Sequence, residues 1–201
     1  MFVQVIQGRT GKPEEVHAAL ERWVKELAPG AAGWIGSTGG VTDDGRMIAL
    51  ARFESADAAR RNSERAEQDQ WWRETAALLD GDASFADSED VTLDLVGDPD
   101  RAGFVQIMRG RGTDPDRARE LMSQDSEKWA AFRPEVLGTV AVAHPGGGYT
   151  VAIYFTSEAD AREGEAKEPP PELAAQMEEM NKLMTEPPEF FDLKQPWLYS
   201  R

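Results

Sequence analysis

Two kinds of apolar pattern alternate along the first half of the chain. Residues 2–8 form a run of β-branched and aromatic side chains, which predicts a β-strand. A helix is predicted after Pro13, because apolar residues then recur at intervals of three and four: Val16, Leu20, Trp23, Val24 and Leu27. Residues 33–41 and 46–53 predict two further strands, joined as a hairpin by an Asp-Asp-Gly turn.

A second helix and a fourth strand complete this pattern. Ser55 is suited to begin the helix, because its side-chain oxygen can accept a hydrogen bond from a free amide of the first turn. The helix is predicted to break near 62–69 and to resume with the apolar residues Trp71, Trp72, Ala76 and Leu79. Residues 91–96 are interpreted as the fourth strand. The order is therefore βαββαβ, the ferredoxin-like split unit.

The second half of the chain repeats the first at a spacing of 102 residues. FVQVIQGR at 2–9 matches FVQIMRGR at 104–111, and FESADAAR at 53–60 matches FTSEADAR at 155–162. A repeat of this length indicates a duplicated domain, because solenoid repeats are about 20–50 residues long. The elements predicted for the second copy are strands at 103–110, 136–143, 149–156 and near 197–200, a helix at 114–132 and a broken helix at 157–185.

The predicted fold class is α+β, with two tandem ferredoxin-like βαββαβ units. The first unit is expected at 1–97 and the second at 103–201, with 98–102 as a linker. The helices of such a unit cover one face of its antiparallel sheet, so the other face needs a covering partner. The sheet of the second copy, in the same chain, can cover this face. The expectation is therefore a dimeric α/β-barrel-like pair, with the sheets packed face to face around a cavity.

The strand patterns also predict which side chains face that cavity. In the first strand, Val3 and Val5 are expected to lie under the helices, and the opposite set to face the cavity: Phe2, Gln4, Ile6 and Gly8. In the third strand, the set expected under the helices is Met47, Ala49, Ala51 and Phe53. Arg52 would then face the cavity, with Tyr154 at the equivalent place in the second copy. A shift of one residue in register would exchange the two faces.

Composition and charge narrow the classes of function. The net charge is −15, from 22 basic and 37 acidic residues, which argues against nucleic acid and anionic membranes as partners. The chain has no cysteine, and neither His17 nor His144 lies in a metal-binding motif, so no metal site and no cofactor are predicted. No apolar stretch approaches the ~20 residues of a membrane span, and no signal-like start is present, so a cytoplasmic protein is expected.

The chain resembles the dimeric α/β-barrel superfamily in its antibiotic-biosynthesis-monooxygenase-like branch, in a tandem two-copy form. The segments FESADAARRN and FTSEADAR after the third strands, and Gln70-Trp71-Trp72 in the second helix, carry the resemblance. It implies an activity among those of the superfamily, which include cofactor-independent quinone-forming oxygenases, haem-degrading monooxygenases and small isomerases. Many members have a histidine where this chain has Asn62 and Gly164, which speaks against haem ligation from that helix.

Three hypotheses for the function follow, and the sequence leaves open whether the protein is an enzyme. The first is cofactor-free oxygenation of an aromatic or polyketide-type substrate, and the second is a non-catalytic binding or sensing module. The third is a barrel filled by side chains that serves in interaction or structure. The ligand-binding candidates are Gln4, Arg52, Asn62, Trp71, Trp72, Gln106 and Tyr154, with the N-terminal copy favoured as the site. The expected partner is a small hydrophobic or aromatic ligand. The chain is expected to be a monomer with an internal pseudo-dimer, and further self-association is left open.

Overall fold

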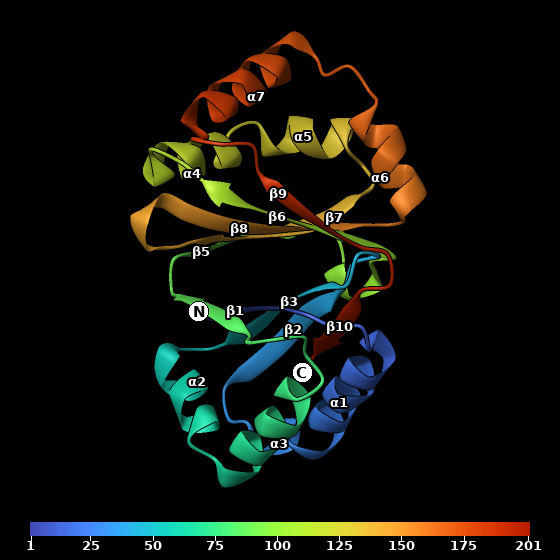
Figure 1. Ribbon diagram of the computed structural model, residues 1–201. Helices are drawn as coiled ribbons and strands as arrows, with labels where there is room; N and C mark the ends of the chain where they lie inside the picture. Colours follow the sequence, from blue (N-terminus) through green and yellow to red (C-terminus); the bar gives the residue numbers. More distant parts are fainter. The chain divides into compact units, whose positions relative to one another are not determined.

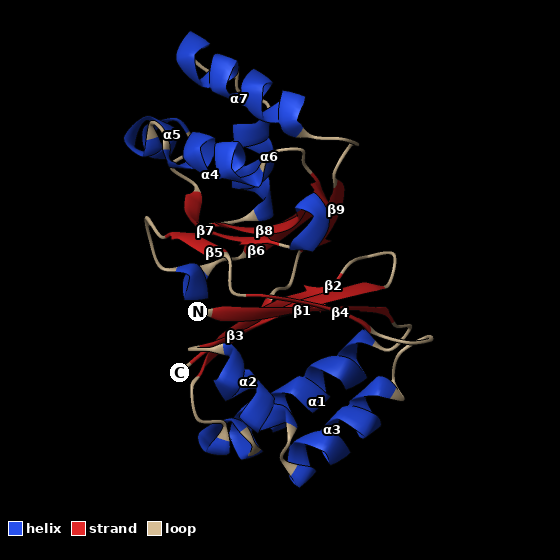
Figure 2. Ribbon diagram, turned by 90° about the vertical axis from the view of Figure 1, so that its left-hand side faces the viewer, coloured by secondary structure: helices blue, strands red, loops and turns tan.

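The first compact unit of the protein is an antiparallel sheet with its helices on one face. A computed structural model describes residues 1–201, and Figure 1 shows its elements. The unit comprises residues Met1–Val91 and Gln195–Arg201. Its strands, in the order β10-β2-β3-β1-β4, are Trp197–Ser200, Trp34–Val41, Arg46–Phe53, Phe2–Arg9 and Ser84–Ser88. Its helices are α1 (Pro13–Glu26), α2 (Ala56–Ser63) and α3 (Ala66–Ala76), and Figure 2 shows them on the same side of the sheet.

The second unit, Thr92–Lys194, repeats this arrangement. Its strands, in the order β5-β7-β8-β6-β9, are Val91–Asp94, Val136–Ala143, Gly148–Phe155, Phe104–Arg111 and Glu189–Leu193. Its helices are α4 (Pro115–Ser123), α5 (Ser126–Phe132), α6 (Glu158–Glu165) and α7 (Pro171–Leu183). The predicted α+β fold class is confirmed: both sheets are antiparallel, and each carries its own helices.

The same local signal begins the second helix of both copies. The Ser55 hydroxyl accepts a hydrogen bond from the Ala58 amide (3.2 Å), and the Ser157 hydroxyl accepts one from the Asp160 amide (3.1 Å). The predicted break in the second helix of the first copy is confirmed between α2 and α3. The single helix predicted at 114–132 is wrong, because the left-handed backbone of Asp125 (φ 54°) divides it into α4 and α5.

The last strands differ from the prediction. The strand that pairs with β1 is β4, whereas β5, which was predicted for this place, joins the sheet of the second unit. In the same way β9 pairs with β6, and the C-terminal β10 pairs with β2 of the first sheet. The compact units therefore do not follow the predicted boundaries at 97 and 98–102. The reason is that β4 has little apolar alternation, and no local pattern states which sheet a strand will join.

The register of β1 on β3 corrects the predicted faces. Gln4 lies opposite Ala51 and Ile6 lies opposite Ala49, and residues directly opposite each other share a face of the sheet. Ile6 also packs against the cluster of Val16, Met47 and Trp197, in which Val16 belongs to α1. The alternate residues of β1 from Phe2 to Gly8 therefore face the helices, contrary to the prediction. The set that was expected under the helices in β3 (Met47, Ala49, Ala51 and Phe53) is correctly placed.

Strand β10 brings aromatic side chains from the C-terminus onto α1. The ring of Trp197 stacks on His17, with centroids 4.7 Å apart and planes 3° from parallel. A hydrogen bond of 3.1 Å joins His17 Nε2 to the hydroxyl of Tyr199. Burial and the nearby Glu21 carboxylate raise the pKa of Tyr199. None of the helices is long and apolar enough to cross a membrane.

The buried position of Trp197 predicts a large stability effect. Replacing Trp197 with Ala should lower the free energy of unfolding by about 3–5 kcal/mol, because it removes a buried aromatic side chain that packs on α1. Urea denaturation followed by far-UV circular dichroism measures this change. Val96→Ala, at an exposed position, is the control and should change stability by less than about 0.5 kcal/mol. Equal midpoints for the two variants would contradict the packing described here.

Candidate functional site

The first unit contains a cavity of about 280 Å³ between its sheet and its three helices. All of the residues that line it belong to that unit. The sequence predicted a cavity on the other side of the sheet, away from the helices. The location in the N-terminal copy agrees with the copy that the sequence favoured.

Small side chains on two neighbouring strands form the floor of the cavity. They are Ser37 and Gly39 on β2 and their direct neighbours Ala51 and Ala49 on β3. The positions 102 residues later carry a larger side chain in every case: Thr139, Ala141, Ile153 and Val151. These four residues pair in the same way on β7 and β8. The difference in floor volume explains why the first copy has room beneath its helices, because protein interiors otherwise pack closely.

Aromatic side chains form the walls. Trp23 donates a hydrogen bond from Nε1 to Gln68 Oε1 (2.6 Å), and Trp71 donates one from Nε1 to the carbonyl of Ala19 (2.8 Å). Both indoles are therefore held by bonds between α1 and α3. Further lining rings are Trp34, Phe53, Trp72, Phe85 and Trp197. Walls of this kind suit a flat, largely apolar ligand.

Trp72 and Phe85 mark the open side of the cavity. Their rings meet edge to face with centroids 5.2 Å apart. Phe85 lies on the edge strand β4 and is 48% exposed, although it lines the cavity. An exposed aromatic ring at this place would cover part of a bound ligand.

Asn62 presents hydrogen-bond donors from α2. It is only 6% exposed and lines the cavity. Its carbonyl oxygen accepts a hydrogen bond from Arg65 Nη1 (2.9 Å), and the same nitrogen donates to the carbonyl of Leu27 (3.1 Å). Arg65 thereby fixes the orientation of the amide, and the Asn62 Nδ2 group is left to bind a ligand.

Gln4 presents an acceptor from β1. Its Nε2 group donates a hydrogen bond to Asp87 Oδ1 on the neighbouring strand β4 (3.0 Å). This bond directs the amide so that the carbonyl oxygen remains available. Gln4 lines the cavity and, with Asn62, gives it one acceptor and one donor amide.

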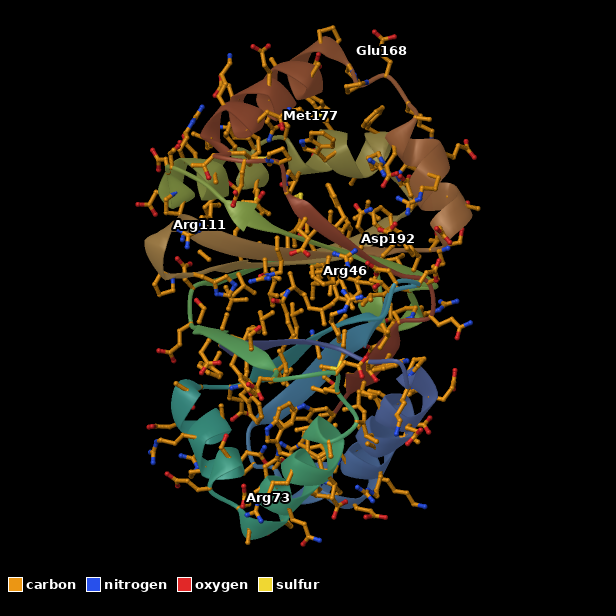
Figure 3. The ribbon with its side chains drawn as sticks, in the orientation of Figure 1. Arg46, Arg73, Arg111, Glu168, Met177 and Asp192 are labelled. Atoms are coloured by element: carbon orange, nitrogen blue, oxygen red, sulfur yellow. The ribbon has the colours of Figure 1, made fainter.

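The cavity is lined almost entirely by side chains that carry no charge. Among the lining residues only Asp69 is an acid or a base, and its half-exposed side chain is paired with Arg73, on the outer side of α3 in Figure 3. The cavity therefore offers no buried general base. The structure also contains no cluster of three or more histidine and carboxylate side chains that could hold a metal ion.

Four of the seven predicted ligand-binding candidates come together in this cavity: Gln4, Asn62, Trp71 and Trp72. Arg52 does not, because it alternates with the floor residues and points to the opposite face of the sheet, where its Nε atom is buried without a hydrogen-bond partner. Gln106 and Tyr154 belong to the second unit and are also not part of the cavity. Gln106 donates to Asp192 Oδ1 (2.9 Å), and Tyr154 is 1% exposed.

Several lining residues were missed by reasoning from the sequence. Trp197 is far away in the chain and arrives only through the pairing of β10 with β2. Phe85 lies in a strand that the pattern did not reveal. The floor residues could have been found from the repeat, because the equivalent residues of the second copy are all larger. This difference points to a cavity only once it is known which face of β2 and β3 lies under the helices.

In the second unit, charged side chains occupy the region that corresponds to Asn62. The counterpart of Asn62 is Gly164, and a Cβ atom there would overlap the carboxylate of Glu135. Glu135 is 7% exposed and is paired with Arg133. The residues equivalent to this ion pair in the first unit are Ala31 and Gly33. The larger floor fills space that is open in the first unit, and the carboxylate of Glu135 lies where the Asn62 side chain begins in the first unit.

A second ion pair lies on the same side of that sheet. Arg162 is paired with Asp192, which Figure 3 shows on β9, and its guanidinium lies 5.2 Å from the ring centroid of Phe104. The equivalent Arg60 instead pairs with Asp57 and Glu64 at the surface of α2. The two copies thus use the same fold with different interiors.

Solved structures of the same fold align with nearly the whole chain. A monooxygenase-like protein from Lactobacillus acidophilus NCFM has a TM-score of 0.75 at 11% identity, covering 99% of this chain and 96% of that chain. Its counterpart from Fusobacterium nucleatum has a TM-score of 0.73 at 8% identity, covering 100% and 94%. An anthrone oxidase-like protein has a TM-score of 0.65 at 12% identity, covering 100% and 91%. No family model and no curated protein matches the sequence.

The chain has the same fold as these three structures, with two ferredoxin-like units in tandem. The predicted resemblance is confirmed at the level of the fold. The cavity of the first unit lies between its sheet and its helices, and the residues that line it all belong to that unit.

Proposed function

We propose that the first unit binds a small aromatic or polyketide-type molecule in its cavity. The observation that carries this proposal is the combination of a floor of small side chains with walls of tryptophan and phenylalanine. Such a space suits a flat ring system, and the amides of Gln4 and Asn62 can fix its orientation. The second unit, with its larger floor residues and its buried ion pair, serves to maintain the fold.

Native mass spectrometry of the freshly purified chain tests this proposal. The expected result is a single co-purified small molecule per chain, released on denaturation. Trp72→Leu should reduce its occupancy severalfold, because the variant removes one aromatic wall and its contact with Phe85. Met177→Ala, at an exposed position on α7 (Figure 3), should leave occupancy unchanged. A chain that carries no small molecule and binds no added 1-naphthol would contradict the proposal.

Oxygenation without a cofactor is the second candidate function. Its support is the likeness of fold to an anthrone oxidase-like protein, together with the donor amide of Asn62 in the cavity. In such a reaction the methylene carbon of an anthrone-type substrate loses a proton, and dioxygen adds to the carbon. Loss of water then leaves a carbonyl, so that CH₂ and O₂ become C=O and H₂O. Asn62 would stabilise negative charge on the substrate oxygen.

Oxygen consumption with anthrone and with a quinol tests this second candidate. Because the cavity has no buried base, we expect the rate to rise with pH until the substrate itself is ionised. Asn62→Ala should lower kcat by roughly 10²-fold if its amide stabilises the developing charge. Ser63→Ala is the control, since this neighbouring hydroxyl already donates to the carbonyl of Ala59 (3.1 Å). Oxygen consumption equal to that of buffer would contradict catalysis while leaving binding intact.

A further inference from the structure

One polar side chain in the floor of the cavity forms no hydrogen bond within the protein. Ser37 lies on β2 and is 7% exposed, and its hydroxyl has no hydrogen-bond partner. It lies opposite Ala51 on one side and Tyr199 on the other, so its side chain is on the helix face of the sheet and belongs to the floor. Leaving a buried hydroxyl unpaired costs roughly 1–3 kcal/mol, so its presence here needs an explanation.

The other hydroxyls that line the helix side of the cavity are satisfied. Ser63 donates to the carbonyl of Ala59 (3.1 Å), and Thr75 donates to the carbonyl of Trp71 (2.9 Å). Both bonds lie within a helix, where serine and threonine commonly bond a carbonyl one turn earlier. Ser37 lies in a strand whose own amides and carbonyls pair with β3 and β10, so the backbone there offers its side chain no equivalent partner.

The surroundings of Ser37 define the chemistry that it can bind. Its neighbours on the floor are Gly39, Ala49 and Ala51, and none of them is polar at the side chain. An ionised group placed there would lose its hydration without gaining a counter-charge. A neutral hydroxyl or carbonyl oxygen could instead form one hydrogen bond with Ser37, which can both donate and accept.

We infer that Ser37 is a specificity-determining residue that binds a neutral oxygen on the buried end of the ligand. This inference rests on the proposed binding function and specifies its ligand. The molecule is an uncharged aromatic whose inner end carries a phenol or ketone oxygen, and whose outer end lies against Trp72 and Phe85. Gln4 and Asn62 remain available for further polar groups along its edge.

The inference is tested with two probes that differ by one hydroxyl, 1-naphthol and naphthalene. Dissociation constants for the full chain are measured by ligand-observed NMR titration. The wild-type chain should bind 1-naphthol about fivefold to tenfold more tightly than naphthalene, as expected for one added hydrogen bond. Ser37→Ala should remove most of this preference and leave the affinity for naphthalene within about twofold. Ser63→Ala should keep the preference.

Thermal unfolding of the free variants separates ligand binding from a structural role. Ser37→Ala should be at least as stable as wild type, because it removes an unpaired hydroxyl; a lower melting temperature would overturn the inference. A preference for 1-naphthol that survives Ser37→Ala would also overturn it while leaving the proposed function standing. Failure of both probes to bind would overturn the proposed function, and with it the role of Ser37.

Discussion

Two indole hydrogen bonds hold α1 and α3 together as one layer. The cavity exists only while this layer stays in place above the small side chains of the sheet. Trp23 binds Gln68 and Trp71 binds the carbonyl of Ala19, so each helix supplies a donor to the other. A helix free to move would settle onto the small side chains below it, because packed interiors leave few voids. Here the two helices are fixed to each other by partly buried hydrogen bonds.

In the second unit a similar hydrogen bond joins the helices, but larger side chains lie on the sheet beneath them. Trp129 on α5 donates to Gln176 on α7 (2.8 Å), which matches the bond between Trp23 and Gln68. Its floor, however, carries Val151 and Ile153 in place of alanines, and its ion pair of Arg133 with Glu135 lies against Gly164. Duplication within one chain allows the two interiors to differ, because each copy can change its side chains without changing the other copy. A homodimer would have to change both sites together.

The repeat, the first three strands of each copy and the helix starts could be predicted because they depend on local patterns. The faces of β1 could not, because Val3 and Val5 are as apolar as a helix-facing set and only the pairing of Gln4 with Ala51 decides the side. The places of β5 and β10 depend on distant pairings, which brought Trp197 into the site without any local signal. Asn62 and Trp72 were found from the family resemblance. Arg52 was assigned to the correct face of β3, but the cavity lies on the other face of the sheet. Ser37 was missed, because a serine in a strand has no distinctive pattern.

The most direct test is to replace a small floor residue of the first unit with the larger residue found at the equivalent position of the second unit. Ala51→Ile reproduces Ile153 at the equivalent position, and Ile153→Ala is the matched control in the other unit. The binding of 1-naphthol to each folded variant should be measured by ligand-observed NMR. The account predicts that Ala51→Ile abolishes binding, whereas Ile153→Ala keeps the wild-type affinity. Wild-type affinity in Ala51→Ile would show that the ligand does not occupy this cavity and would contradict the account.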